Sequence, residues 1–109
     1  GDDIGTVHEF LADYLSSARK LTREMETAFA KEAFSDIGAT AHKLKSSSRS
    51  VGALALGDLC ANLENACKAS DKTAIENGMK EFLIIMDSVE NEISRQLRNG
   101  WDEALGEIR

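Results

Sequence analysis

Proline is absent from the 109 residues of this chain. Because proline breaks helices, its absence favours long uninterrupted helices and argues against a loop-rich β sandwich. Long apolar runs are missing too: the longest, Phe82–Met86, falls far short of the roughly 20 residues that span a bilayer, and no signal-peptide pattern opens the chain. We therefore expect a cytoplasmic protein without membrane insertion.

Cysteine is scarce, since the chain has only Cys60 and Cys67. On one helix these residues are two turns apart, which puts their α-carbons about 10 Å from each other and beyond disulfide reach. Neither belongs to a metal-type spacing such as C-x-x-C. We expect both to be buried small apolar residues, and we predict no metal site and no cofactor.

Nucleotide-binding patterns are also missing. Neither G-x-x-x-x-G-K-[ST] nor G-x-G-x-x-G occurs in the chain. A chain of 109 residues has one modest core and no room for a separate ATP-binding domain. The protein is therefore not expected to phosphorylate itself from ATP.

Acidic residues are absent between Asp36 and Asp58, a stretch that carries Lys43, Lys45 and Arg49. The whole chain nevertheless has a net charge of −6. An isolated basic patch on an acidic protein suits a small anionic target, such as a phosphoryl group, or an acidic pocket of a partner. It does not suit nucleic acid, whose phosphate backbone would repel the rest of the molecule.

Four amphipathic segments with short connections predict an all-α fold, an antiparallel up-down four-helix bundle. The first helix is expected over 4–29, where a strict seven-residue apolar repeat is typical of shallow helix packing; a coiled-coil rod is the alternative. The second helix should begin after Ser35 as its N-cap and end near Val51, with Gly52 as the stop. A third helix is expected over roughly 54–69.

The fourth helix should begin after the cap Asp71 and end at Asn99–Gly100. We expect one domain over 1–109, with its core over about 4–98 and a tail over 99–109. The tail residues after Gly100, which include Trp101, form either a short extra helix folded onto the bundle, with Trp101 packing there, or a frayed stub. A monomer is expected, because one chain supplies all four helices.

The second helix presents two neighbouring stripes. One is apolar or small and passes through positions 37, 41, 44, 48 and 51 at helical spacing. The other is polar and consists of Gly38, His42, Lys45, Ser46 and Arg49. The polar stripe offers a nucleophile, positive charge, and small residues that let another surface come close.

The string Ala41-His42-Lys43-Leu44-Lys45-Ser46-Ser47-Ser48, followed by Val51-Gly52-Ala53, resembles the signature of histidine-containing phosphotransfer (HPt) domains of two-component phosphorelays. That signature reads approximately Ala-His-x-Leu-Lys-Gly, a few small residues, then x-Gly-Ala. The four-helix pattern extends the resemblance across roughly residues 4–98.

The resemblance implies a role for each matching residue. His42 would accept the phosphoryl group, Lys45 would contact its oxygens, and Gly52 would close the helix. The family usually has glycine where this chain has Ser46, which adds a hydroxyl at the rim of the docking surface. With Ser46, we expect three further residues to take part in partner docking: Gly38, Lys43 and Arg49.

The implied partners are receiver domains of response regulators or of a hybrid sensor kinase. Such a receiver would supply the phospho-aspartate and the divalent metal ion. A relay intermediate would accept the phosphoryl group from one receiver aspartate and pass it to another.

The residue types in the polar stripe are suited to phosphoryl transfer, independently of the family resemblance. A neutral imidazole is a good nucleophile near neutral pH. In-line phosphoryl transfer depends mostly on positioning and electrostatics, and Lys45, one turn from His42, can reach the phosphoryl oxygens.

Two other functions are possible. One is a helical adaptor that binds a receiver without phosphotransfer, and the other is a dimeric helix pair of a kinase core. His8 begins His-Glu-Phe-Leu-Ala-Asp, which faintly resembles a sensor-kinase dimerisation helix but lacks its basic residue and proline. We therefore expect His8 to be an ordinary surface residue.

Overall fold

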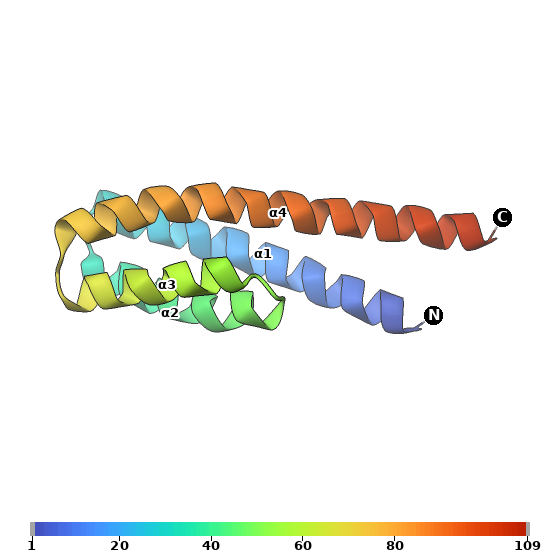
Figure 1. The fold of residues 1–109 in the computed structure, drawn as a ribbon, viewed down its shortest axis with the longest axis horizontal. Coiled ribbons are helices and arrows are strands. Elements are labelled where there is room, and N and C mark those ends of the chain that lie inside the picture. Colours follow the sequence, from blue (N-terminus) through green and yellow to red (C-terminus); the bar gives the residue numbers. More distant parts are fainter. Residues whose placement is uncertain (1, 109) are drawn as a thin grey trace.

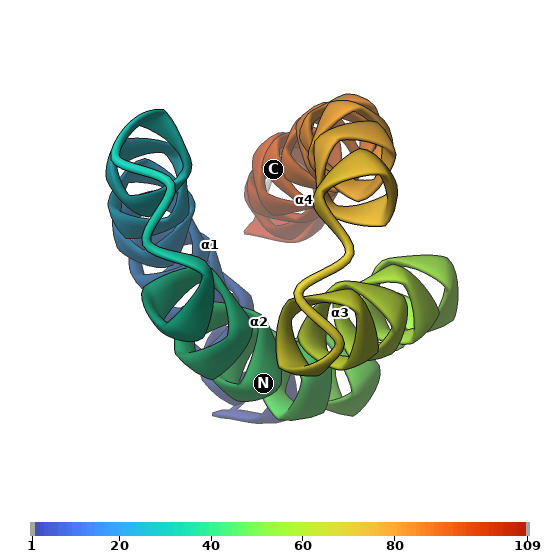
Figure 2. The ribbon, with the colours of Figure 1, turned by 90° about the vertical axis from the view of Figure 1, so that its left-hand side faces the viewer.

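The computed structural model describes the backbone of residues 2–108 and the side chains of residues 3–99. Within these residues the chain forms four helices and no strands: α1 (Asp2–Ala30), α2 (Phe34–Ser50), α3 (Leu54–Lys68) and α4 (Lys72–Ile108). Successive helices run up and down, with α1 and α4 as the long pair (Figure 1). Seen along the bundle, they surround one core in chain order (Figure 2). The predicted all-α four-helix bundle is confirmed.

The core consists of one apolar stripe from each helix. Its buried members are Tyr14, Leu15, Ala18, Met25, Ala28, Ile37, Ala41, Leu44, Leu56, Leu59, Cys60, Leu63, Cys67, Ile75, Met79, Phe82, Met86 and Ile93. Both cysteines are free thiols in this core, as predicted. Within residues 2–108, no helix combines the length and the apolar composition that a bilayer crossing requires.

The first turns of α1 do not share this core. Ile4, Val7 and Phe10 continue the apolar pattern but are about half exposed. At 1.5 Å per residue, α1 is about 44 Å long and α2 only about 26 Å, so α1 projects beyond the short pair (Figure 1). The apolar repeat of α1 therefore identifies the face that can be buried, and the length of the neighbouring helices determines how much of that face is buried.

Two predicted signals at helix ends are confirmed. Asp71 caps α4, because its Oδ1 accepts a hydrogen bond of 3.1 Å from the backbone N–H of Ala74. Gly52 has φ +84° directly after α2, a left-handed conformation that glycine adopts without steric cost. Its N–H donates to the carbonyl of Arg49 at 3.1 Å, which satisfies a helix-end acceptor.

Two other predicted boundaries are wrong. Ser35 is not the N-cap of α2, since the helix already begins at Phe34 after Ala33, which makes no side-chain cap. The fourth helix does not end at Asn99–Gly100 but continues to Ile108. A glycine inside a helix costs about 1 kcal/mol relative to alanine and does not forbid it. The predicted packing of Trp101 lies outside the described side chains.

The α2–α3 hairpin sets the geometry of the site. The turn between these helices comprises residues 51–53, and the antiparallel register places Gly38 beside Cys67. A Cβ added at Gly38 would lie 3.2 Å from Cys67 Cβ, which is tighter than ordinary van der Waals contact. The glycine therefore lets the two helices approach closely one turn before His42.

Candidate functional site

His42 stands on the surface of α2. Ala41 and Leu44 on the same helix are fully buried, and they hold α2 against the core. Because His42 lies outside this buried stripe, its side chain is 61% exposed. The ring is therefore accessible to another protein.

Glu64 on α3 organises the site, although the sequence analysis did not single it out. Its Oε2 lies 2.8 Å from Nδ1 of His42, and its Oε1 accepts a hydrogen bond of 2.7 Å from Nζ of Lys45. The side chain is only 12% exposed, because His42, Lys45 and Lys68 lie against its carboxylate. One carboxylate thus connects the imidazole and the ammonium group, which lie one turn apart on α2.

The charge on Glu64 fixes the proton on the ring. The hydrogen bond from Lys45 holds the pKa of Glu64 down at about 2, and the bond with His42 adds to this lowering against the effect of burial. At neutral pH the carboxylate is therefore ionised and can only accept hydrogen bonds. In the neutral imidazole Nδ1 must then carry the proton, which leaves the lone pair on Nε2.

A second lysine stands next to this carboxylate. Nζ of Lys68 lies 3.7 Å from Oε2 of Glu64, one helical turn away on α3, and its side chain is exposed. Two ammonium groups from different helices therefore flank the His42–Glu64 pair. Positive charge at this position favours a phosphoryl group or another anion beside the ring.

The model of the family described as "Hpt domain" matches residues 9–106. The chain belongs to the Hpt domain family. Neither the curated proteins nor the solved structures contain a significant match. The family match confirms the predicted resemblance, and Hpt domains work in phosphorelays with receiver domains.

A groove between α2 and α3 begins beside the histidine of this Hpt domain. It has a volume of about 680 Å³, and His42 and Glu64 line it together with Phe34 and Cys67. From the register of the hairpin, it extends from His42 toward the end of the bundle where the α3–α4 turn lies. His8 on α1 is not part of it.

The structure separates the other predicted site residues into three kinds. Lys43 and Ser46 are exposed on α2 near His42, as docking residues would need to be. Gly38 lines the groove but is itself buried against Cys67. Its main role is therefore to let α2 and α3 pack closely. Arg49 is directed to α3, where Nη2 donates to Oδ1 of Asp58 at 3.1 Å.

No group of three or more histidine, cysteine or acidic residues in the described part of this Hpt domain is arranged to hold a metal ion. The groups that meet at the site are an imidazole, a carboxylate and two neighbouring ammonium groups.

Proposed function

We propose that this Hpt domain is a phosphorelay intermediate that accepts a phosphoryl group from a receiver phospho-aspartate onto His42 and passes it to another receiver aspartate. The observation that carries the proposal is the exposed ring of His42 with Nδ1 bonded to Glu64 at 2.8 Å. This arrangement directs the lone pair of Nε2 toward an incoming partner.

In the transfer step, the lone pair of Nε2 attacks the phosphorus atom in line with the bond to the aspartate oxygen. The new N–P bond forms as that P–O bond breaks, and the aspartate carboxylate leaves with the electron pair. Positive charge develops on the ring while Nδ1 keeps its proton. The ionised carboxylate of Glu64 stabilises this charge and holds the ring plane fixed.

Lys45 supplies positive charge for the phosphoryl oxygens. Its ammonium group has three protons, and one of them is donated to Glu64. The other two protons remain for the transferring group. Because the bond to Glu64 also anchors Lys45 beside the ring, the cation is positioned before the partner arrives.

The partner is a receiver domain, which brings its phospho-aspartate and its divalent metal ion. It docks over His42 and the adjoining groove, with Lys43, Ser46 and Arg49 at the rim and Gly38 in the groove wall. In this proposal the domain works as a monomer in the cytoplasm.

The test is incubation with a panel of purified receiver domains phosphorylated by acetyl phosphate. We expect label on His42 that is labile in acid and stable in base, as for a phosphoramidate. His42→Gln should abolish labelling, and His8→Gln, the matched histidine control, should leave it unchanged. Labelling that survives in His42→Gln would exclude the proposal, and receiver binding without any label would indicate the adaptor function.

Two further variants test the supporting residues. Lys45→Ala should slow transfer without stopping it, since the nucleophile is intact. Glu64→Gln should slow transfer by about 10- to 100-fold, because the amide keeps only one acceptor and no longer fixes the ring. Glu92→Gln on α4 is the control, as its carboxylate binds Arg95 and Gln96 and not His42. Unchanged rates in Lys45→Ala or Glu64→Gln would remove that residue from the mechanism.

A further inference from the structure

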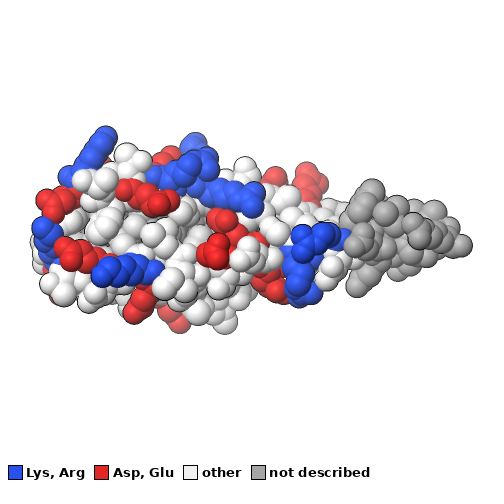
Figure 3. Space-filling model, turned by 90° about the horizontal axis from the view of Figure 1, so that it is seen from above, with Lys and Arg blue, Asp and Glu red and all other residues white. Residues whose placement is uncertain are grey.

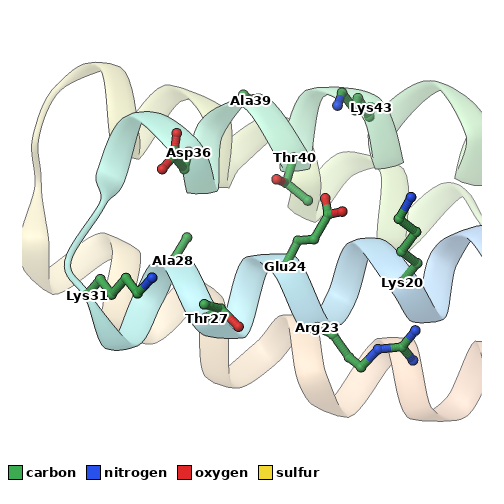
Figure 4. A pocket seen from close by; sticks show the side chains of 10 residues that line it. All are labelled: Lys20, Arg23, Glu24, Thr27, Ala28, Lys31, Asp36, Ala39, Thr40 and Lys43. Atoms are coloured by element: carbon green, nitrogen blue, oxygen red, sulfur yellow. The ribbon is translucent and has the colours of Figure 1, made fainter.

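A second hollow lies on the other side of α2 from the His42 groove. This cleft between α1 and α2 has a volume of about 510 Å³. Figure 4 shows Lys20 and Glu24 rising from α1 toward α2, with Lys31 beyond the end of α1 and Lys43 on α2. The cleft is therefore lined by charged side chains from both helices.

Among the side chains of residues 3–99, the cations of the cleft form no ion pair. Six Lys and Arg side chains in the described part of the chain form ion pairs: Arg19, Lys45, Arg49, Lys68, Lys72 and Arg95. Of the remaining cations in residues 3–99, four line this cleft: Lys20, Arg23, Lys31 and Lys43. The other two are Lys80 and Arg98. The unpaired positive charge of the described surface is thus concentrated at one place.

Two acidic residues, Glu24 and Asp36, also line the cleft, so its balance remains positive. The face crossed by α4 is different, because Lys and Arg are interspersed there with Asp and Glu (Figure 3). On a protein with a net charge of −6, an unpaired basic cleft favours an acidic partner.

The cleft adjoins the His42 groove. Ala39 and Lys43 on α2 line both hollows, so these two residues form the ridge between them. Alanine makes this ridge low, and both residues are exposed. A protein that sits on His42 and the groove can therefore reach across the ridge to the cleft.

We propose that the α1–α2 cleft is a second contact for the receiver domain, and that it binds an acidic surface segment beside the receiver's phospho-aspartate. Lys20, Lys31 and Lys43 attract this segment, with Arg23 at the outer edge of α1. The contact selects receivers by surface charge, while His42 performs the transfer. This inference rests on the proposed function, because it takes the same partner.

The experiment compares two charge-matched double variants. Lys20→Gln/Lys31→Gln removes two cations from the cleft, and Lys80→Gln/Arg98→Gln removes two unpaired cations elsewhere. Transfer from a panel of receivers phosphorylated by acetyl phosphate is measured at low and high ionic strength. Exposed ion pairs are individually weak, so we expect the cleft variant to be about fivefold slower at low salt and nearly normal at high salt, where screening removes the attraction. The control should behave as wild type.

Two measurements separate docking from chemistry. Phosphoramidate is a small donor that needs no docking, so it should label His42 equally in wild type and in the cleft variant. Glu24→Gln removes an acidic group from the cleft and should speed transfer from the same receivers at low salt. Equal low-salt rates for the cleft variant and wild type with every receiver that transfers would overturn the inference and leave the proposed function standing.

Binding of the unphosphorylated receivers keeps the two proposals distinguishable. If no receiver transfers but receivers bind, and Lys20→Gln/Lys31→Gln weakens that binding, the docking inference holds while the relay function fails. If no receiver binds, the inference is overturned as well, because it commits to a receiver as the occupant.

Discussion

Tyr14 and Ser48 share a hydrogen bond of 2.8 Å inside the bundle, between α1 and α2. Both residues are buried, so water cannot replace a lost partner. Tyr14→Phe keeps the ring and its packing but leaves the hydroxyl of Ser48 without Tyr14. An unsatisfied buried polar group costs about 1–3 kcal/mol. Because a helical serine can turn to the carbonyl four residues earlier, we expect the lower part of this range, a loss of about 1–2 kcal/mol in the free energy of unfolding.

Ser48→Ala should lower the free energy of unfolding by a similar amount, since it leaves the buried hydroxyl of Tyr14 without its hydrogen-bond partner. The double variant should cost less than the sum of the two, because removing both partners leaves no unsatisfied group. Urea unfolding followed by helical circular dichroism measures each free energy, and the melting temperature should fall by about 4–8 °C for each kcal/mol. Costs that add within about 0.5 kcal/mol would show that the two hydroxyls do not interact.

The same pair gives a pH dependence of known sign. Burial raises the pKa of Tyr14 above its usual value of 10.0, and the hydrogen bond with Ser48 only partly offsets this. The stability that neutral Tyr14 contributes is therefore present below pH 10 and is lost as the pH rises through the folded-state value. Tyr14 is the single tyrosine of the chain, so tyrosinate absorbance reports it directly. Ionisation of the folded protein at the pKa of free tyrosine would refute the reasoning.

Three other measurements test separate features. Gly52→Ala should lower the free energy of unfolding by about 1–2 kcal/mol, because φ is +84° there, whereas Gly5→Ala on α1 should raise it slightly; equal effects would contradict the left-handed turn. The carboxylate of Glu64, with its pKa near 2, contributes stability above pH 4.5 that is lost as the pH falls toward 2. In Glu64→Gln, the free energy of unfolding should therefore fall less steeply between pH 4.5 and pH 2 than in wild type. Burial raises the pKa of Cys60 to about 11, so iodoacetamide at pH 8 should modify it in urea but not in the folded protein, as mass spectrometry would show; rapid native labelling would contradict its burial.

The sequence predicts the helices and the core because both depend on local periodicity. Stripes at helical spacing identify which residues face inward, and the small, polar and basic stripe beside them places His42 outside. The end of a stripe is harder to predict. Ile4 and Val7 are exposed because α2 ends and α3 begins before the bundle reaches them. The helix α4 continues past Gly100 because the helical preference of the residues around one glycine can outweigh its cost.

Glu64 could not be found from periodicity, because its role depends on a second helix. In the sequence it is one acidic residue next to a buried leucine, 22 positions after His42. Only the closely packed α2–α3 register brings it to Nδ1. A prediction of that register, from the short turn at residues 51–53, would have placed position 64 opposite position 42.

The short turn at residues 51–53 and the register of the α2–α3 hairpin determine which residues of the two helices face each other. One residue added or removed inside α3, between Leu59 and Glu64, would rotate Glu64 by about 100° relative to buried Leu56 and Leu59, and the carboxylate would then face away from the imidazole. Changes of side chain in the turn leave this spacing intact. The partner of His42 is thus fixed by the number of helical residues that separate Glu64 from the core contacts of α3.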